Sequence, residues 1–389
     1  MKVCHVITRM IVGGAQENTL LSAKGLAAAG HECVLLTGPS PGPEGELLAR
    51  TGIPEGVEVV ECPFLVREIS PLNEIRAYRF MKKFFRERGF DLVHTHSSKA
   101  GILGRLAAHA AGVKKVVHTI HGLAFHPRER WWKNKLYIAL EAKAAKVSDK
   151  IFAVAQAMIE QSLAVGIGKR EQYQVVYSGM ELERFLNAER ENDLRRDLGI
   201  PEDAKVVGTV ARLFPLKGYE ELMKVIPSLA ATRQDLYFLF VGNGSMMDEI
   251  RQWAAAQGLA ERIRFAGLVP PHEVCRYVAL MDIAVHLSLK EGLPRVAVQA
   301  LAEGKAVVAY DLDGTPEVVR TGETGVLISP LDWQAAADAV CRLLDSPEEL
   351  KRMGENGRAL VRELFPWKRM SDILLEDYKQ LLAEKAGKN

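Results

Sequence analysis

Short runs rich in β-branched residues alternate with helical patterns along this chain, and the alternation occurs twice. The first series includes VCHVIT, LVHTH, KVVHTI and KIFAV, with helices expected over 16–29, 73–88, 100–111 and 158–165. The second includes VVGTVA, LYFLFVG, DIAVHLS and AVVAYD, each followed by a helix-like segment. Strands that alternate with helices favour parallel sheets covered by helices. The sequence therefore predicts an α/β fold with two doubly wound, Rossmann-like domains.

A polar stretch between the two series predicts the domain boundary. The stretch is ELERFLNAERENDLRRDLGIPED and begins at Glu181. We expect an N-terminal domain over 1–180 and a C-terminal domain over 181–366. Residues 367–382, WKRMSDILLEDYKQLL, have helical apolar spacing and are expected to pack back onto the first domain. Two such domains would face each other across a cleft lined by the carboxyl ends of their strands.

Composition and charge restrict the class of protein. The 389 residues are 48% hydrophobic and 26% charged, which is typical of globular chains. No run of about 18 apolar residues occurs, and His5 and Arg9 interrupt the N-terminal run too early for a signal peptide, so a cytoplasmic protein is expected. Five widely spaced cysteines without a CxxC pair favour reduced thiols.

The positive charge is concentrated in the N-terminal half. Residues 1–180 carry 24 Lys and Arg against 16 Asp and Glu, a balance of +8 within a net charge of +2 for the chain. Such an excess fits a surface that meets anionic lipid or a phosphorylated substrate, and it fits equally a solvated surface with no partner. A nucleic-acid partner is not expected.

The first strand ends at a pair of glycines. Gly13 and Gly14 stand at a strand-to-helix turn, where backbone N–H groups can face an anion. A plain tight turn is the alternative. The GxGxxG fingerprint of dinucleotide-binding domains is absent from this turn, which argues against an NAD enzyme.

Two further strand ends in this half carry polar candidates. His94 and His96 are followed by Ser97 and Lys99, and strand alternation points both histidines to one face. Because no carboxylate or third histidine is apparent nearby, we expect no metal, and we take these four residues as candidates for the acceptor side. His121 follows KVVHTI at another strand end and is a site candidate, with a structural role as the alternative.

A tryptophan pair, Trp131 and Trp132, lies in the segment after His121, among Arg128, Arg130 and Lys133. Aromatic residues interleaved with cations fit an interfacial anchor, in which the rings meet lipid and the cations meet headgroups. The same residues are equally compatible with a pair of tryptophans packed in the core. Both interpretations stay open.

The C-terminal half contains candidate groups for a phosphate and for a sugar. Arg212 and Lys217 stand on the turn after VVGTVA, where fixed cations can neutralise a departing nucleoside diphosphate in place of a metal ion. Glu291 occupies another strand-to-helix turn, and its carboxylate would repel phosphate but accept hydrogen bonds from sugar hydroxyls. Gly292 leaves backbone amides accessible, and a helix starting near Val296 would direct its N-terminus at phosphate.

The motifs VARLFPLKG, FVGNG, EGLPRVAVQAL and DGTPEVV, with GGAQE and IHG upstream, together resemble glycosyltransferase family 4, across nearly the whole chain. The resemblance implies the GT-B fold and a retaining, metal-independent transfer of a sugar from a nucleotide diphosphate-sugar, without another cofactor. It implies that the C-terminal domain holds the donor and the N-terminal domain the acceptor. The resemblance does not name the base of the donor, and we expect a UDP-sugar.

The resemblance also assigns roles by matching position. Arg212 and Lys217 would grip the diphosphate, Glu291 would hold donor sugar hydroxyls, and His121 would line the donor sugar near the reacting carbon. The remaining donor-binding positions would be Gly13, Gly14, Gly242, Gly292, Leu293, Pro294 and Gln299.

Two positions depart from the family pattern. The family's Glu-x7-Glu reads Glu291 and Gln299 here. Glutamine keeps a carbonyl acceptor for a ribose hydroxyl but loses the charge, so donor binding is expected to weaken by about 1 kcal/mol. The family's Asn-Gly-Val-Asp at the domain junction reads Ser-Gly-Met-Glu over 178–181, which keeps the hinge glycine.

The acceptor and two rival functions stay open. The segment RAYRFMKKFFRERG, from Arg76, alternates cations with aromatic residues. One interpretation is weak attachment to an anionic membrane, which would serve a lipid-linked acceptor in surface polysaccharide assembly. The other is an amphipathic helix packed on the sheet with its cations solvated, and a soluble glycan acceptor also stays open. The rival functions are a nucleotide-sugar epimerase or hydrolase of the same fold and, because of Gln299, a catalytically weak sugar-nucleotide-binding protein.

Overall fold

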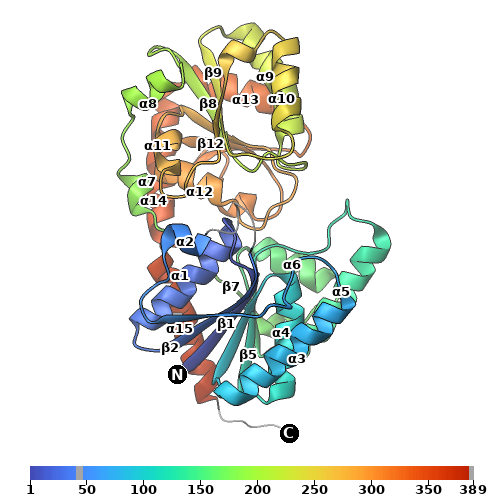
Figure 1. Cartoon of the computed structure of the whole chain (residues 1–389). Coiled ribbons are helices and arrows are strands. Elements are labelled where there is room, and N and C mark those ends of the chain that lie inside the picture. Colours follow the sequence, from blue (N-terminus) through green and yellow to red (C-terminus); the bar gives the residue numbers. More distant parts are fainter. Residues whose placement is uncertain (41–46, 385–389) are drawn as a thin grey trace. The chain divides into compact units, whose positions relative to one another are not determined.

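The structure, a computed structural model, describes residues 1–40 and 47–384. The chain divides into two compact units. The N-terminal unit comprises Met1–Met180 and the segment from Pro366 onward, and the C-terminal unit comprises Glu181–Phe365. Each unit contains one parallel sheet with helices packed on it (Figure 1). The predicted α/β fold with two doubly wound domains is confirmed.

The N-terminal unit has a seven-stranded parallel sheet of order β3-β2-β1-β4-β5-β6-β7. Chain order changes direction between β1 and β4, and in sheets of this kind ligands bind beside the carboxyl ends of the strands at that point. The strands are β1 (Lys2–Arg9), β2 (Glu32–Gly38), β3 (Val57–Glu61), β4 (Leu92–His96), β5 (Lys115–Ile120), β6 (Lys150–Ala153) and β7 (Tyr173–Val175).

Helices cover both faces of this sheet (Figure 1). One face packs against α1 (Gly14–Ala28), α2 (Leu47–Thr51) and α15 (Trp367–Ala383), and the other against α3 (Pro71–Arg88) and α4 (Ser98–Ala111). Helix α5 (Trp131–Ala145) contacts α4, and α6 (Gln156–Ala164) contacts β6 and β7. The last helix of the chain thus completes the core of the first unit.

The C-terminal unit repeats the scheme with six parallel strands, in the order β10-β9-β8-β11-β12-β13. Its point of reversal lies between β8 and β11. The strands are β8 (Lys205–Val210), β9 (Leu236–Val241), β10 (Ile263–Gly267), β11 (Ile283–His286), β12 (Ala306–Tyr310) and β13 (Gly325–Ile328). The helices are α7 (Glu183–Leu186), α8 (Asn192–Asp197), α9 (Tyr219–Thr232), α10 (Met247–Ala256), α11 (Val274–Ala279), α12 (Arg295–Ala302), α13 (Trp333–Leu344) and α14 (Pro347–Leu364).

The aromatic residues of α3 pack on the sheet. Met81 and Phe85 are buried, and Phe80 and Phe84 pack partly buried against the same core cluster. The core therefore uses the apolar face of this helix, as the second of the two sequence interpretations expected. Among the described residues, no helix combines the length and the apolar character that crossing a membrane requires.

The tryptophan pair at the start of α5 lies on the surface. Trp131 is 71% exposed and Trp132 is 47% exposed. Lys135 lies over the Trp131 ring and Lys133 over the Trp132 ring, at 5.1 and 5.8 Å from the ring centroids. The interpretation as a core aromatic pair is therefore wrong.

Candidate active site

The C-terminal unit brings Lys217 and Glu291 together at the point where its strand order reverses. Lys217 follows β8 and Glu291 follows β11, and these strands are neighbours in the sheet. Lys217 Nζ lies 2.7 Å from Glu291 Oε1 and donates to the carbonyl oxygen of Lys290 at 3.3 Å. Backbone pairing fixes the two loops, since Leu289 N donates to Leu216 O at 2.9 Å. Residues 74 positions apart therefore form one ion pair.

Two glycines permit the close approach of neighbouring loops at this edge of the sheet. Gly218 has φ 90°, and a Cβ there would lie 2.6 Å from the carbonyl carbon of Leu287. Gly242, at the end of β9, has φ 143°, and its Cβ would lie 2.0 Å from the carbonyl oxygen of Ala211. Any side chain at either position would push the loops apart. Gly242 thus shapes the site through backbone packing, and Gly218, which the sequence analysis did not select, has the same role beside Lys217.

Helix α12 begins at the same edge, at Arg295, one residue before the expected start. Pro294 precedes it and has no side-chain acceptor to cap the first turn, Leu293 is buried, and the carbonyl oxygen of Gly292 accepts from Gly314 N at 3.1 Å. The first amides of a helix and its dipole favour an anion at this end. Gln299 lies one turn further along α12 and is partly exposed.

The charge state of Glu291 is set by opposing effects. Burial raises the pKa of its carboxyl, but Lys217, His286 and hydrogen bonds outweigh burial and hold the pKa below its usual value. Burial lowers the pKa of His286, partly offset by Glu291, whose Oε1 lies 3.6 Å from His286 Nε2. At neutral pH the site therefore holds a carboxylate, an ammonium and a neutral imidazole. Sequence reasoning missed His286, although a histidine that ends the apolar run DIAVH was a usable signal.

Arg212 stands on the loop after β8, as the sequence analysis expected. Its side chain is exposed, and its guanidinium lies 5.3 Å from the centroid of the Phe214 ring. The structure thus places the second predicted cation on the loop that carries Lys217.

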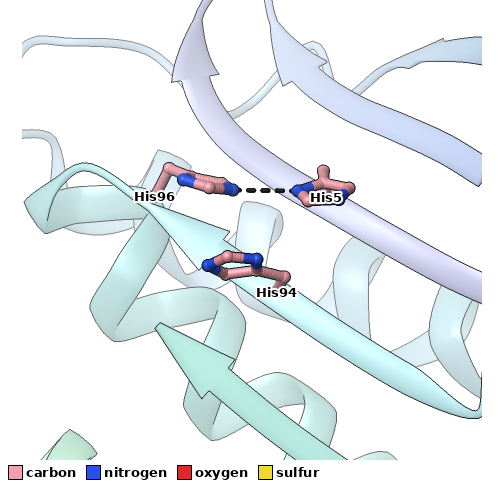
Figure 2. Close-up of side chains that lie close together, drawn as sticks. All are labelled: His5, His94 and His96. Atoms are coloured by element: carbon pink, nitrogen blue, oxygen red, sulfur yellow. Dashed lines mark hydrogen bonds between the residues drawn. The ribbon is translucent and has the colours of Figure 1, made fainter. Parts of the chain in front are cut away.

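In the N-terminal unit a buried cluster of histidines lies where β1 meets β4, as Figure 2 shows. His5 of β1 pairs in register with His94 of β4. His5 Nδ1 lies 2.9 Å from His96 Nε2, and His96 Nδ1 lies 2.9 Å from His121 Nε2. His94 bonds Thr119 Oγ1 through Nε2 at 2.7 Å. His5, His94 and His96 are all 0% exposed.

This burial differs from the predicted acceptor-side role of His94 and His96. Helix α15 covers their face of the sheet, and the Tyr378 hydroxyl of that helix bonds His94 Nδ1. Neither imidazole presents a surface to an acceptor here. His121, in contrast, lines a cavity.

His5 supplies the third histidine that the sequence analysis did not find near His94 and His96. The three offer ligand atoms within 4.8 Å of one another, a spacing that a metal site requires. Both ring nitrogens of His94 and of His96, however, already bond protein groups. A metal ion would have to break these bonds, so the donor set does not fit one as it stands, and the absence of a metal stays a prediction.

A cavity of about 250 Å³ opens at the carboxyl ends of β4 and β5. Ser97, Ser98, His121, Gly122 and Ala15 are among the residues that line it. Ala15 belongs to the first turn of α1, next to Gly13 and Gly14, so the cavity lies against the N-terminus of that helix.

Of two predicted acceptor-side residues, Ser97 and Lys99, one lines this cavity and the other does not. Ser97 lines it and shares a hydrogen bond of 2.8 Å with Thr8 Oγ1. Lys99 does not line it, and pairs instead with Glu74 of α3 at 3.0 Å. The structure therefore gathers Ser97 and His121, but not Lys99, at one site.

Comparison with known proteins identifies the family. Residues 12–184 match the sequence model described as Glycosyltransferase Family 4, and residues 190–360 match that of Glycosyl transferases group 1. The D-inositol 3-phosphate glycosyltransferase of Nocardia farcinica is 30% identical over 315 residues, which cover 77% of this chain and 68% of that relative. The chain belongs to glycosyltransferase family 4. The resemblance seen in the motifs is confirmed, and this family 4 chain is a glycosyltransferase.

Other matches span almost the whole family 4 chain. The UDP-Gal:alpha-D-GlcNAc-diphosphoundecaprenol alpha-1,3-galactosyltransferase of Escherichia coli is 27% identical over 390 residues, which cover 99% of this chain and 98% of the relative. The crystal structure of Anabaena HepE in complex with UDP and glucose has a TM-score of 0.83 at 22% identity and covers 98% of this chain and 100% of that one. The fold is therefore GT-B. These matches favour a transferase over both rival functions.

Proposed function

We propose that this glycosyltransferase moves a sugar from a UDP-sugar to an acceptor hydroxyl with retention of configuration and without a metal ion. The observation that carries the proposal is the Lys217–Glu291 pair beside the start of α12. A cation, a helix N-terminus and a carboxylate at one sheet edge match the two parts of such a donor, its diphosphate and its sugar. The Anabaena HepE complex with UDP-glucose and the UDP-Gal named for the Escherichia coli relative support a UDP-sugar.

The chemistry follows from where charge develops. As the bond between the anomeric carbon and the diphosphate oxygen breaks, negative charge grows on the diphosphate, and Arg212 and Lys217 stabilise it as fixed cations. The acceptor oxygen bonds to the anomeric carbon on the face of the sugar from which the diphosphate leaves. The proton of the acceptor hydroxyl passes to an oxygen of the leaving phosphate. Glu291 accepts hydrogen bonds from the sugar hydroxyls and so holds the ring for this attack.

The donor assignment is tested by thermal shift and by product analysis. Among UDP-, GDP- and ADP-sugars, we expect a UDP-sugar to raise the melting temperature most, because a ligand that binds only the folded state stabilises it. Transfer should persist in EDTA and give a product with the donor's anomeric configuration by NMR. Inversion, loss of activity in EDTA, or rapid epimerisation of the donor without acceptor would each contradict the proposed reaction.

For the acceptor, the proposal is a lipid-linked glycan of surface polysaccharide assembly, reached from an anionic membrane surface. The name of the Escherichia coli relative includes a diphosphoundecaprenol acceptor. In this chain Trp131, Trp132 and Leu136 expose apolar side chains at the start of α5, interleaved with Lys133 and Lys135. Aromatic residues beside cations suit the interface of an anionic bilayer. These residues take the anchoring role that the sequence analysis considered for α3.

Vesicle binding tests this anchor. The chain should bind anionic vesicles at low salt and release them at high salt, and the double variant Trp131→Ala, Trp132→Ala should bind several-fold more weakly. Leu268→Ala serves as the matched control, because Leu268 is an exposed apolar residue (44%) of the C-terminal unit. Equal binding by both variants would remove α5 as the anchor.

A further inference from the structure

Three imidazole rings form one hydrogen-bonded line from the interior of the N-terminal unit to its cavity. The line runs from His5 to His96 to His121 through two contacts of 2.9 Å, the first of which Figure 2 shows as a dashed line. His5 lies on β1, His96 ends β4 and His121 follows β5, and these strands are consecutive neighbours in the sheet. The sheet itself therefore sets the spacing of the three rings.

Each ring of the buried part carries a single proton. Burial lowers the pKa of His5 to about 3 and that of His96 well below its usual value. A neutral imidazole has one N–H donor and one bare nitrogen acceptor. Because His96 uses both nitrogens within the line, fixing its tautomer fixes the direction of both hydrogen bonds.

The inner end of the line decides that direction. His5 Nε2 is buried and has no hydrogen-bond partner within the described part of the chain. If each N–H of the line donated inward, from His121 toward His5, then His5 Nε2 would carry a proton with no acceptor. Buried donors without partners are rarer than buried acceptors without partners. If each N–H donates outward, Nε2 is the bare nitrogen and His5 donates through Nδ1. The outward direction avoids the stranded donor.

We infer that His5 and His96 are positioning residues that hold His121 in the tautomer protonated at Nδ1. His5 Nδ1–H donates to His96 Nε2, and His96 Nδ1–H donates to His121 Nε2. His121 then meets a ligand oxygen as a hydrogen-bond donor and not as a base. The inference rests on the proposed function only in that His121 faces the donor sugar; the tautomer itself is argued from the hydrogen bonds of the line.

The wild-type chain provides the first test, without any substrate. Nitrogen NMR of isotopically labelled histidines separates protonated from bare ring nitrogens, and each tautomer has its own pattern of couplings to the ring protons. We expect His121 to show a protonated Nδ1 and a bare Nε2, with His5 and His96 showing the same pattern. A protonated Nε2 on His121 would overturn the inference. So would stoichiometric zinc in the purified chain, because a metal on these nitrogens would replace the line.

Variants of His5 test whether the line acts on catalysis. His5→Leu removes the donor to His96, so His121 should populate both tautomers and turnover should fall about tenfold, by analogy with the loss of hydrogen-bond partners from metal-binding histidines. His5→Asn keeps an N–H near the position of Nδ1 and should restore most of the turnover. An unchanged His121 tautomer in folded His5→Leu would contradict the inference.

Tyr378→Phe is the matched control for burial. Tyr378 is fully buried in the same cluster but bonds His94, which is outside the line. This variant should leave the His121 signals and turnover unchanged. If it changed the His121 tautomer as much as His5→Leu does, the line would not be the cause. The NMR pattern is measured without donor, so it tests the tautomer separately from UDP-sugar transfer. Either hypothesis can therefore be contradicted while the other holds.

Discussion

At the scale of single residues, the Lys217–Glu291 pair joins stability to catalysis. Both side chains are largely shielded, at 26% and 17% exposed. In Lys217→Ala the carboxylate of Glu291 would stay in a buried position beside a neutral His286, which costs about 1–3 kcal/mol of unfolding free energy. The diphosphate would also lose a fixed cation, so turnover should fall by about a hundredfold or more. Urea unfolding and steady-state kinetics measure the two effects.

Lys224→Ala separates those effects. Lys224 Nζ pairs with Glu221 Oε1 at 3.0 Å in the same unit, and Glu221 is also buried. Because Lys224 is half exposed and Glu221 also accepts from the Tyr310 hydroxyl, this variant should lose at most about 1 kcal/mol of stability and keep near-normal turnover. Near-normal turnover in Lys217→Ala would remove Lys217 from the donor site.

Gln299 is the second test at this scale. A glutamate there regains a charge-assisted hydrogen bond to a ribose hydroxyl, so Gln299→Glu should tighten UDP binding by about 1 kcal/mol, or roughly fivefold. Glu303 stands one turn further along, and burial raises its pKa to about 8, so it is neutral at pH 7 and does not repel the new charge. Calorimetric titration with UDP measures the change. Weaker binding would place residue 299 away from the ribose.

At the scale of secondary-structure elements, the contact between α1 and α15 depends on one glycine. A Cβ on Gly25 would lie 2.5 Å from Ser371 Cβ, which rotation of the serine hydroxyl cannot relieve. Alanine favours a helix by about 1 kcal/mol over glycine. We nevertheless expect Gly25→Ala to lower the unfolding free energy by about 1–3 kcal/mol, because overpacking costs more than propensity returns.

The double variant Gly25→Ala, Ser371→Gly checks the cause. Removing the serine side chain makes room for the new methyl group, so denaturant unfolding should show a large part of the loss restored relative to Gly25→Ala. If the double variant lost the sum of the two single effects, the clash would not explain the loss.

The positions of helices and strands could be predicted from the sequence, but which of these elements pack against each other could not. The spacing of apolar residues predicted helices at 73–88 and 100–111, and the structure has Pro71–Arg88 and Ser98–Ala111. Alternation shows that His94 and His96 share a face, but it does not show which strand lies beside β4 or what covers that face. The neighbours are His5, from the first strand, and Tyr378, 284 residues from His94.

For the candidate site too, the sequence indicated the individual residues but not how they pair. Glycines and charged residues at strand ends were visible as candidates because strand ends in parallel sheets are where ligands bind. That Lys217 pairs with Glu291 depends on β8 lying next to β11, which local sequence does not encode. The family resemblance assigned Lys217 and Glu291 to one donor site, but it did not predict that they form an ion pair.

At the scale of the whole molecule, one buried carboxyl makes stability depend on pH. Glu303 is 5% exposed, its Oε1 has no hydrogen-bond partner within the described residues, and burial raises its pKa from 4.5 to about 8. Between these values the folded chain holds a proton that the unfolded chain has released. Its contribution to stability is therefore complete below about pH 4.5 and is lost as pH rises toward 8.

Glu303→Gln should remove this dependence. The amide has a similar shape and no charge, so the variant should equal the wild type near pH 5 and exceed it near pH 8 by on the order of 2 kcal/mol. Urea unfolding across this range measures the difference, and comparing the two chains at each pH cancels the titration of all other groups. Because the charge of Lys305 lowers the pKa of Glu303, Lys305→Met should raise that pKa further and widen the difference. A pH-independent gap between Glu303→Gln and the wild type would mean that Glu303 is ionised throughout, with a partner that offsets its burial.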